Sequence, residues 1–274
     1  MNTAHPTRTA TLKFLADLSE PLVYVPSKGG GDKTEHVGNF RNQQVPVLDA
    51  RTDLIKPSLD REGFLLVPHA SAVSDFYDDD VLRHTYHDEL KVLVSRITGA
   101  RRVEIFDDTR RSTSLERQRQ TGIREPANIV HNDYTAQSGP KRLTDWLKST
   151  GTDRASLPQG RFAIINAWRP IRNPVYDQPL IFCDATSIES CDLIAMERRA
   201  DERVGAVQAA LYNPQQRWYF YPTMQPDEVL LFKTYDSAED GRARFTPHSS
   251  FRDPLAPANM PARESIESRC LVFF

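Results

Sequence analysis

The sequence has few cysteines, no long apolar run and almost no net charge, and each absence excludes a class of protein. Its three cysteines, Cys183, Cys191 and Cys270, are too few and too scattered for a disulfide framework or a cysteine-rich zinc site. No stretch of about 18 apolar residues is present, and the N-terminus lacks the apolar core of a secretory signal. The formal charge of −2 gives no general attraction to nucleic acid or to an anionic membrane. We therefore expect a cytoplasmic protein with reduced cysteines and no nucleic-acid or membrane partner, and the sequence predicts no oligomeric state.

The composition and the pattern of apolar residues predict one mainly β domain. Hydrophobic residues make up 39% of the 274 residues, which is enough to bury a sizeable core. Apolar residues at three- and four-residue intervals predict a helix over 75–98, which Ser74 or Asp75 could cap and Gly99 could end. The remaining pattern consists of short β-prone runs separated by turn residues, without a βα rhythm. These features favour an antiparallel barrel or sandwich with helices on one face.

Two histidines and one aspartate form a candidate metal site. In the stretch IVHNDYT, His131 and Asp133 are two residues apart, so both would point to the same side of an extended strand. His248 follows another strand-like segment. Two imidazoles and one carboxylate on one face of an octahedron are the ligand set of non-haem Fe(II) oxygenases and leave positions open for O2 and a co-substrate. The spacing is equally compatible with a His–Asp hydrogen bond at a strand end and an unrelated surface histidine.

An iron site of this kind commonly uses 2-oxoglutarate, whose far carboxylate needs a cation. Arginine is well suited because its planar fork pairs with a carboxylate through two hydrogen bonds. Arg263 and Arg269 lie six residues apart in the expected last strand, so both would face the same side. Either could instead pair with Glu264 or Glu267 at the surface.

The order and spacing of the motifs resemble one known family. Over about residues 45–274 the chain resembles the iron- and 2-oxoglutarate-dependent oxygenase-like family of specialised metabolism, which includes the fungal gibberellin desaturase and cephamycin-type methoxylation proteins. The motifs that carry the resemblance are DAR (49–51), REGF (61–64), YHDE (86–89), TGA (98–100), VEIFDDTRR (103–111), VHNDYT (130–135), INAWRP (165–170), PLIFCD (179–184), YPTMQPDEVLLFKTYDS (221–237), PHSSFRDP (247–254) and RESIESR (263–269).

The resemblance implies a fold, a cofactor set and a division of the chain. It implies a double-stranded β-helix, a barrel of the jelly-roll or cupin type, in which His131, Asp133 and His248 bind Fe(II). Arg269, and after it Arg263, would bind 2-oxoglutarate. Residues 45–274 would form the oxygenase domain, and residues 1–44 would be an extension packed on the barrel of a single-domain protein.

Further residues near these motifs are candidates for cofactor and substrate contacts. Arg169 could bind an anion or pack beside Trp168, and Asn166 and Thr135 could hydrogen-bond to the co-substrate or orient a metal ligand. Four aromatic side chains could line an apolar substrate pocket or simply form core, namely Tyr134, Trp168, Trp218 and Tyr235.

The resemblance favours an Fe(II)/2-oxoglutarate-dependent oxygenase that hydroxylates, desaturates or cyclises a small specialised metabolite. Two other interpretations remain open from the sequence. One is a mononuclear iron oxidase that does not use 2-oxoglutarate, and the other is a non-catalytic barrel that binds a small molecule. Zinc hydrolysis is disfavoured because no His-Glu-x-x-His motif is present.

Overall fold

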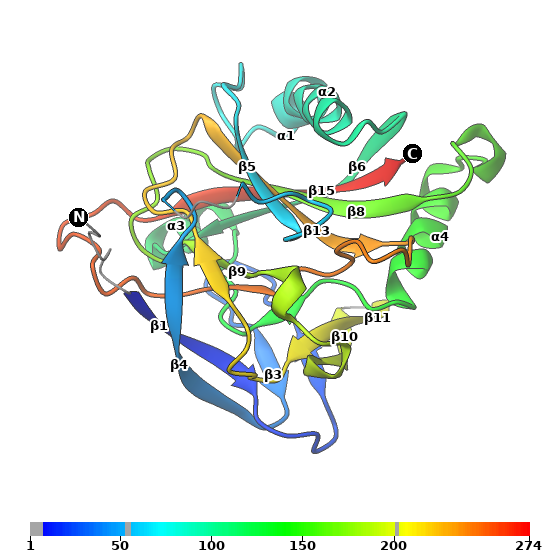
Figure 1. Ribbon diagram of the computed structural model, residues 1–274. Coiled ribbons are helices and arrows are strands. Elements are labelled where there is room, and N and C mark those ends of the chain that lie inside the picture. Colours follow the sequence, from blue (N-terminus) through cyan, green and yellow to red (C-terminus); the bar gives the residue numbers. More distant parts are fainter. Residues whose placement is uncertain (1–7, 53–55, 201–202) are drawn as a thin grey trace.

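Two β-sheets form most of the molecule, as the computed structural model shows for residues 8–52, 56–200 and 203–274 (Figure 1). The first seven residues of the expected N-terminal extension lie outside this described part. The major sheet has ten strands in the order β1-β4-β12-β9-β14-β7-β11-β10-β2-β3, and the minor sheet has five in the order β5-β13-β8-β15-β6.

The major sheet is built from short strands drawn from the whole chain. Its bounds, in spatial order, are β1 Arg8–Leu15, β4 Phe40–Asp49, β12 Trp218–Phe220, β9 Leu180–Cys183, β14 His248–Ser250, β7 His131–Asn132, β11 Arg203–Ala210, β10 Leu193–Ala200, β2 Val23–Val25 and β3 Glu35–Val37. The sheet curls so far that β1 meets β11, through a bridge between Leu15 and Leu211. The curl encloses an apolar cluster that includes Phe14, Val47 and Trp218.

The minor sheet consists of longer strands, and both of its faces are covered. Its bounds are β5 Phe64–Pro68, β13 Glu228–Asp236, β8 Phe162–Pro170, β15 Glu264–Phe273 and β6 Arg102–Ser112. Phe64, Trp168 and Phe232 of this sheet pack against Phe182 and Tyr219 of the major sheet, so these residues form the core between the two sheets. This sandwich of mostly antiparallel strands confirms the predicted mainly β, jelly-roll-like fold class.

The predicted helix over 75–98 is confirmed in type but is shorter at its start. The segment consists of α1 Asp79–Val81, a π-helical turn η1 Leu82–Tyr86, and α2 His87–Thr98. The cap is Asp78 and not Ser74 or Asp75, because the Asp78 carboxylate accepts hydrogen bonds from the backbone N–H groups of Asp80 and Val81. Gly99 ends the helix in the left-handed conformation, as expected. The apolar side of α2 covers the outer face of the minor sheet (Figure 1).

The sequence interpretation missed strands β1, β3 and β10 and two helices. The helices are α3 Leu115–Thr121 and α4 Ser138–Thr150, and the described residues also form three short 3₁₀ turns, η2 Arg154–Ser156, η3 Ala185–Ser187 and η4 Ser190–Asp192. Leu143 and Trp146 of α4 pack with Ile164 and Leu271, whose side chains line the inner face of the minor sheet. Helix α4 therefore covers one end of the space between the sheets (Figure 1). Among the described residues, no helix is long and apolar enough to cross a membrane.

We expect the contact between α2 and the minor sheet to make a large contribution to stability. Leu93 of α2 is 1% exposed, whereas its neighbour Val92 is 70% exposed. Replacing a buried leucine by alanine typically costs about 2–5 kcal/mol, through lost burial and the cavity left behind. Leu93→Ala should therefore lower the free energy of unfolding by about that amount, measured by urea denaturation, and Val92→Ala should leave it nearly unchanged. Equal effects of the two substitutions would contradict this packing.

Candidate metal centre and its pocket

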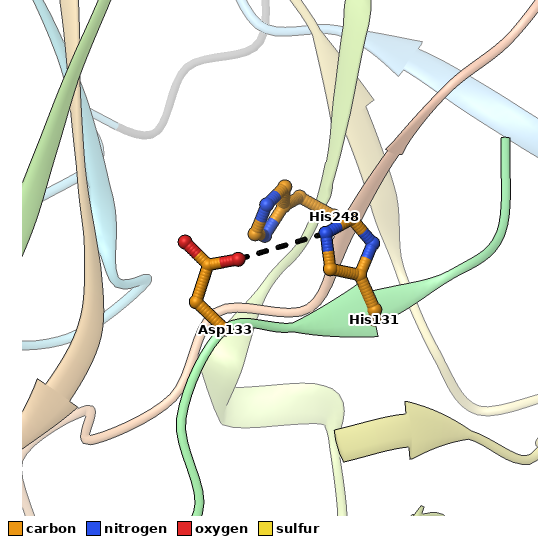
Figure 2. A group of neighbouring side chains, drawn as sticks. All are labelled: His131, Asp133 and His248. Atoms are coloured by element: carbon orange, nitrogen blue, oxygen red, sulfur yellow. Dashed lines mark ion pairs between the residues drawn. The ribbon is translucent and has the colours of Figure 1, made fainter. Parts of the chain in front are cut away.

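The three predicted metal ligands lie close together (Figure 2). His131 on β7 and His248 on β14 are direct partners across an antiparallel strand pair, and their ring centroids are 4.5 Å apart. Asp133 follows β7, and its Oδ1 atom lies 3.7 Å from Nε2 of His131. One ligand atom from each of the three residues lies within 4.8 Å of the other two. The arrangement can hold one metal ion.

Backbone hydrogen bonds fix the orientation of both imidazoles. Nδ1 of His131 lies 2.9 Å from the carbonyl oxygen of Ile129, and Nδ1 of His248 lies 3.0 Å from that of Thr246. Because a carbonyl oxygen only accepts hydrogen bonds, each Nδ1 carries the proton and donates it. The other ring nitrogen, Nε2, is left with its lone pair, which is the form that binds a metal.

The Asp133 carboxylate is oriented by two side chains of the minor sheet. Its Oδ2 atom accepts hydrogen bonds from Nδ2 of Asn166 at 2.8 Å and from Nε of Arg269 at 3.0 Å. Asn166 and Arg269 are register partners on β8 and β15. With Oδ2 engaged in this way, Oδ1 faces the two histidines. Hydrogen-bond partners that do not themselves bind the metal commonly hold a ligating carboxylate in place in this way.

The electrostatic environment favours the protonation states that bind a cation. Burial and the neighbouring His248 lower the pKa of His131 to about 4, and burial also lowers the pKa of His248. Burial alone would raise the pKa of Asp133, but Arg269 and the two imidazoles outweigh it and hold this pKa well below its usual range. At neutral pH the site therefore presents two neutral imidazoles and one carboxylate, which is the donor set that non-haem Fe(II) accepts.

Asn132, which the sequence interpretation missed, connects the segments that carry the ligands. It is fully buried, and its Nδ2 donates to the carbonyl oxygen of Tyr134 at 2.6 Å and to Oε1 of Gln208 at 2.9 Å. Its Oδ1 accepts from the backbone N–H of Thr246 at 3.3 Å, two residues before His248. The position of a polar residue between two predicted ligands could have identified Asn132, because the side-chain amide of a buried asparagine needs several hydrogen-bond partners.

A pocket of about 170 Å³, part of it open to solvent, leads to the candidate metal site. Its wall includes His131, Asp133 and Arg269. The other lining residues are mostly charged or polar, and they include the arginines Arg111, Arg124, Arg142 and Arg198. The sequence interpretation did not single out these four arginines, because each lies in a different segment of the chain.

The two arginines expected to bind 2-oxoglutarate have different surroundings. Arg269 forms ion pairs with three carboxylates, those of Asp133, Asp107 at 2.6 Å and Glu267. Arg263 is 3% exposed, lies over the Trp168 ring at 5.0 Å, and donates to Ser265 and to a backbone carbonyl. Within the described residues no carboxylate pairs with Arg263. Burial, together with the nearby charge of Arg111, lowers the pKa of Arg263 to about 9.

Arg169 and Thr135 do not face the metal site, and the contact with co-substrate expected of each gains no support from these positions. Along β8 the side chains alternate, so Asn166 points inward and Arg169 points to the outer face. There its guanidinium lies over the ring of Phe76 at 5.2 Å and bonds to His69. The Thr135 hydroxyl accepts from the backbone N–H of Ser138 at 2.9 Å and so belongs to the start of α4.

The four aromatic candidates divide between pocket and core. Tyr134 lines the pocket beside Asp133. Trp168 lies in the core between the sheets under Arg263, and Trp218 lies inside the curl of the major sheet, 5.6 Å from Phe14. Tyr235 packs so closely on α4 that a Cβ at Gly139 would lie 2.4 Å from its ring. Trp218 and Tyr235 therefore pack as core residues, and substrate contact by them gains no support from these positions.

The barrel and the His–Asp–His site together define an iron-dependent oxygenase, and comparison with known proteins identifies its family. A family model described as an oxidoreductase/YMDC permease-like domain matches residues 12–273. The chain is 33% identical to the hydroxylase/desaturase efuI of Hormonema carpetanum, over 98% of this chain and 96% of that protein. It is 32% identical to the Fe(II)/2-oxoglutarate-dependent dioxygenase nvfI of Aspergillus novofumigatus, over 94% and 92%. The chain belongs to the iron- and 2-oxoglutarate-dependent hydroxylase/desaturase family of fungal specialised metabolism.

The solved structures agree with this assignment. The chain superposes on the iron and alpha-ketoglutarate-dependent endoperoxidase NvfI with a TM-score of 0.81 and 30% identity, covering 98% of this chain and 99% of that one. The protein is thus an Fe(II)/2-oxoglutarate-dependent dioxygenase of specialised metabolism that acts on a small molecule. Both other interpretations of the sequence, an oxidase without 2-oxoglutarate and a non-catalytic barrel, are set aside.

We expect each of the three ligands to be necessary for Fe(II) binding. His131→Ala, Asp133→Ala and His248→Ala each remove one of three protein donors. Each should therefore weaken Fe(II) binding by roughly a hundredfold or more, which exceeds the loss expected when a residue that only orients a ligand is removed. The measurement is anaerobic calorimetric titration with Fe(II), with unfolding temperature as a check on folding. His84→Ala is the control, because His84 is exposed on η1. Wild-type affinity in any of the three variants would exclude that residue as a ligand.

We expect Asn166 and Arg269 to affect Fe(II) binding through Asp133. Loss of a partner that orients a metal ligand typically costs about 10–100-fold in metal affinity. Asn166→Ala and Arg269→Gln should each show a loss in this range in titrations without 2-oxoglutarate, so that only the metal is measured. Because the two side chains bond the same oxygen atom, the double variant should lose less than the product of the two single effects. Independent effects would mean that they act through different groups.

Proposed function

We propose that His131, Asp133 and His248 are the Fe(II) ligands of this dioxygenase. The observation that carries the proposal is the convergence of two unprotonated Nε2 atoms and one free carboxylate oxygen within 4.8 Å. Bound Fe(II), together with 2-oxoglutarate and O2, supplies the oxidant that attacks a C–H bond of the substrate. The protein's own residues hold the ligands in place, bind the co-substrate and keep water away.

Arg263 binds the far carboxylate of 2-oxoglutarate. Support for this role comes from its burial, from the Trp168 ring that holds its guanidinium flat, and from its lack of a carboxylate partner within the described residues. A buried cation without an anion is costly, so an anion that arrives there is bound strongly. Ser265, whose hydroxyl accepts a hydrogen bond from Nε of Arg263 at 3.1 Å, is a second polar group at the same place.

Arg269, which the sequence favoured for the far carboxylate, acts on the metal ligand instead. Its guanidinium is already shared among Asp133, Asp107 and Glu267. A further carboxylate would have to displace one of these partners. We assign Arg269, with Asn166, the role of positioning Asp133, and keep co-substrate binding by Arg269 as the competing assignment.

The apolar core between the sheets excludes water from the inner side of the metal site. The ring of Phe232 lies 4.7 Å from that of His248, and Phe182 stacks on the same imidazole at 6.4 Å. Tyr134 forms an aromatic part of the pocket wall, and we retain it as a substrate contact. Exclusion of water strengthens the charge interactions inside the site and prevents side reactions.

The substrate is a small specialised metabolite, and the outcome is hydroxylation, desaturation or cyclisation. We place the protein in the cytoplasm, a proposal supported by its few cysteines and by the reduced state that they indicate. We also treat the chain as one domain. Strand β4 crosses the boundary expected between residues 44 and 45 and pairs with β1 on one side and β12 on the other, which supports one domain.

Substitution of Arg263 should separate co-substrate binding from metal binding. Loss of one partner from a buried ion pair costs about 3–5 kcal/mol, which corresponds to about two to three decades in affinity. Arg263→Gln should therefore raise the 2-oxoglutarate concentration needed for half-maximal succinate release at least about a hundredfold, while Fe(II) affinity stays at the wild-type value. Arg269→Gln should do the reverse and mainly weaken Fe(II) binding.

Arg169→Gln is the control, because Arg169 lies on the outer face of the same sheet. If Arg269→Gln raises the 2-oxoglutarate requirement more than Arg263→Gln does, the competing assignment is correct. If wild-type protein releases no succinate from 2-oxoglutarate in the presence of Fe(II) and O2, the proposed function itself fails.

A further inference from the structure

The pocket beside the metal site carries an excess of arginine. Arg111, Arg124, Arg142 and Arg198 all line it, and none of them pairs with a carboxylate in the described part of the chain. Arg111 donates to the carbonyl oxygen of Glu125 at 2.7 Å, and Arg142 lies over the ring of Phe106 at 5.3 Å. Such a group is unexpected in a chain whose formal net charge is −2.

The acidic residues of the pocket do not neutralise these four arginines. Asp133 and Asp107 both pair with Arg269. Asp145 pairs with Lys141 at 2.9 Å. Each acid among the described lining residues therefore pairs with Arg269 or Lys141, and the described part of the pocket keeps a positive surplus.

Binding of the metal and co-substrate leaves this surplus in place. Fe(II) carries two positive charges and 2-oxoglutarate two negative charges, so together they add no net charge. In the proposed function the far carboxylate of 2-oxoglutarate meets Arg263, which is not among the residues of this pocket. The four arginines therefore remain for the substrate.

Arg124 and Arg198 are the two arginines with no side-chain hydrogen bond or ion pair to any described residue. Arg198 lies on β10, beside Tyr24 of β2 and opposite Gly205 of β11. A Cβ added to Gly205 would meet no atom within 4 Å, so space is open in front of this arginine. Burial lowers the pKa of Arg198, and the charges of Arg269 and then Arg124 add to this effect. Two partly buried cations that repel each other create a site for an anion.

The rest of the lining indicates a ligand with an apolar body. Tyr134, Val204 and Val207 give apolar and aromatic surface to the same pocket. Because this apolar surface lies in the same pocket as the arginines, the lining suits an organic acid better than a compact inorganic anion.

We propose that the substrate is an organic acid whose carboxylate is bound by Arg124 and Arg198, with its apolar body directed towards the metal site. The proposal rests on the proposed function, because it names the substrate class of that same site. It makes Arg124 and Arg198 determinants of specificity. A neutral metabolite of the same shape would leave two cations unpaired and would bind less well.

The test uses a matched pair of probes, 2-naphthoate and its neutral isostere 2-naphthamide. Anaerobic protein with Fe(II) and saturating 2-oxoglutarate is titrated with each probe, and binding is measured by fluorescence anisotropy. Naphthoate should bind at least about tenfold more tightly than naphthamide, since charge-assisted hydrogen bonds to arginine are the stronger kind. Arg124→Gln and Arg198→Gln should each remove most of this preference without weakening naphthamide binding.

Arg199→Gln is the matched control, because Arg199 is the next residue of β10, is exposed, and pairs with Glu197. This variant should keep the wild-type preference. Equal binding of the two probes to wild-type protein would overturn the proposal, as would an unchanged preference in both Arg124→Gln and Arg198→Gln. Tighter binding of inorganic phosphate than of naphthoate would overturn the choice of a carboxylate.

A failure of the proposed function would be distinguishable from a failure of this inference. Before the titration, wild-type protein is checked for the visible charge-transfer band that Fe(II) and 2-oxoglutarate produce together. If the band is present and the probes bind equally, only the organic-acid substrate is excluded. If the band is absent, the proposed metal and co-substrate site fails, whatever the probes do.

Discussion

The ion pair between Asp133 and Arg269 is the interaction on which the rest of the site depends. It joins the segment after β7, in the major sheet, to β15 in the minor sheet at a separation of 3.0 Å. Removing two charges from water is costly, and the cost is offset only where further hydrogen bonds satisfy both groups. Asn166 does this for the carboxylate, and Asp107 and Glu267 do it for the guanidinium. The two sheets therefore meet at a polar centre that is surrounded by apolar core.

Much of the fold and the metal site could be predicted from the sequence, because both follow from local patterns. Runs of β-prone residues between turns marked most strands, and the two-residue spacing of His131 and Asp133 placed them on one side of a strand. The spacing alone left a polar turn possible. The order of motifs along the chain, and later the comparisons, removed that alternative.

The sequence pattern was least informative where it could not show to which face of a strand a side chain points. Every residue of β8 is buried, so the sequence does not distinguish its inner face, with Asn166, from its outer face, with Arg169. The same holds for Trp218 and Tyr235, since a buried aromatic side chain suits core and pocket equally. Arg124 and Arg198 were missed because their common property, the lack of a side-chain partner among the described residues, exists only in the folded protein.

The register of the short strands β7 and β14 couples metal binding to correct folding. His131 and His248 face each other on strands of two and three residues, and Asn132 fixes this register through its bonds to Tyr134 and Thr246. A shift of one residue would turn one imidazole to the opposite face of the sheet and would also displace the buried Ile129 and Val130, which precede β7. Metal retention therefore reports on correct strand alignment and on the packing of the core at the same time.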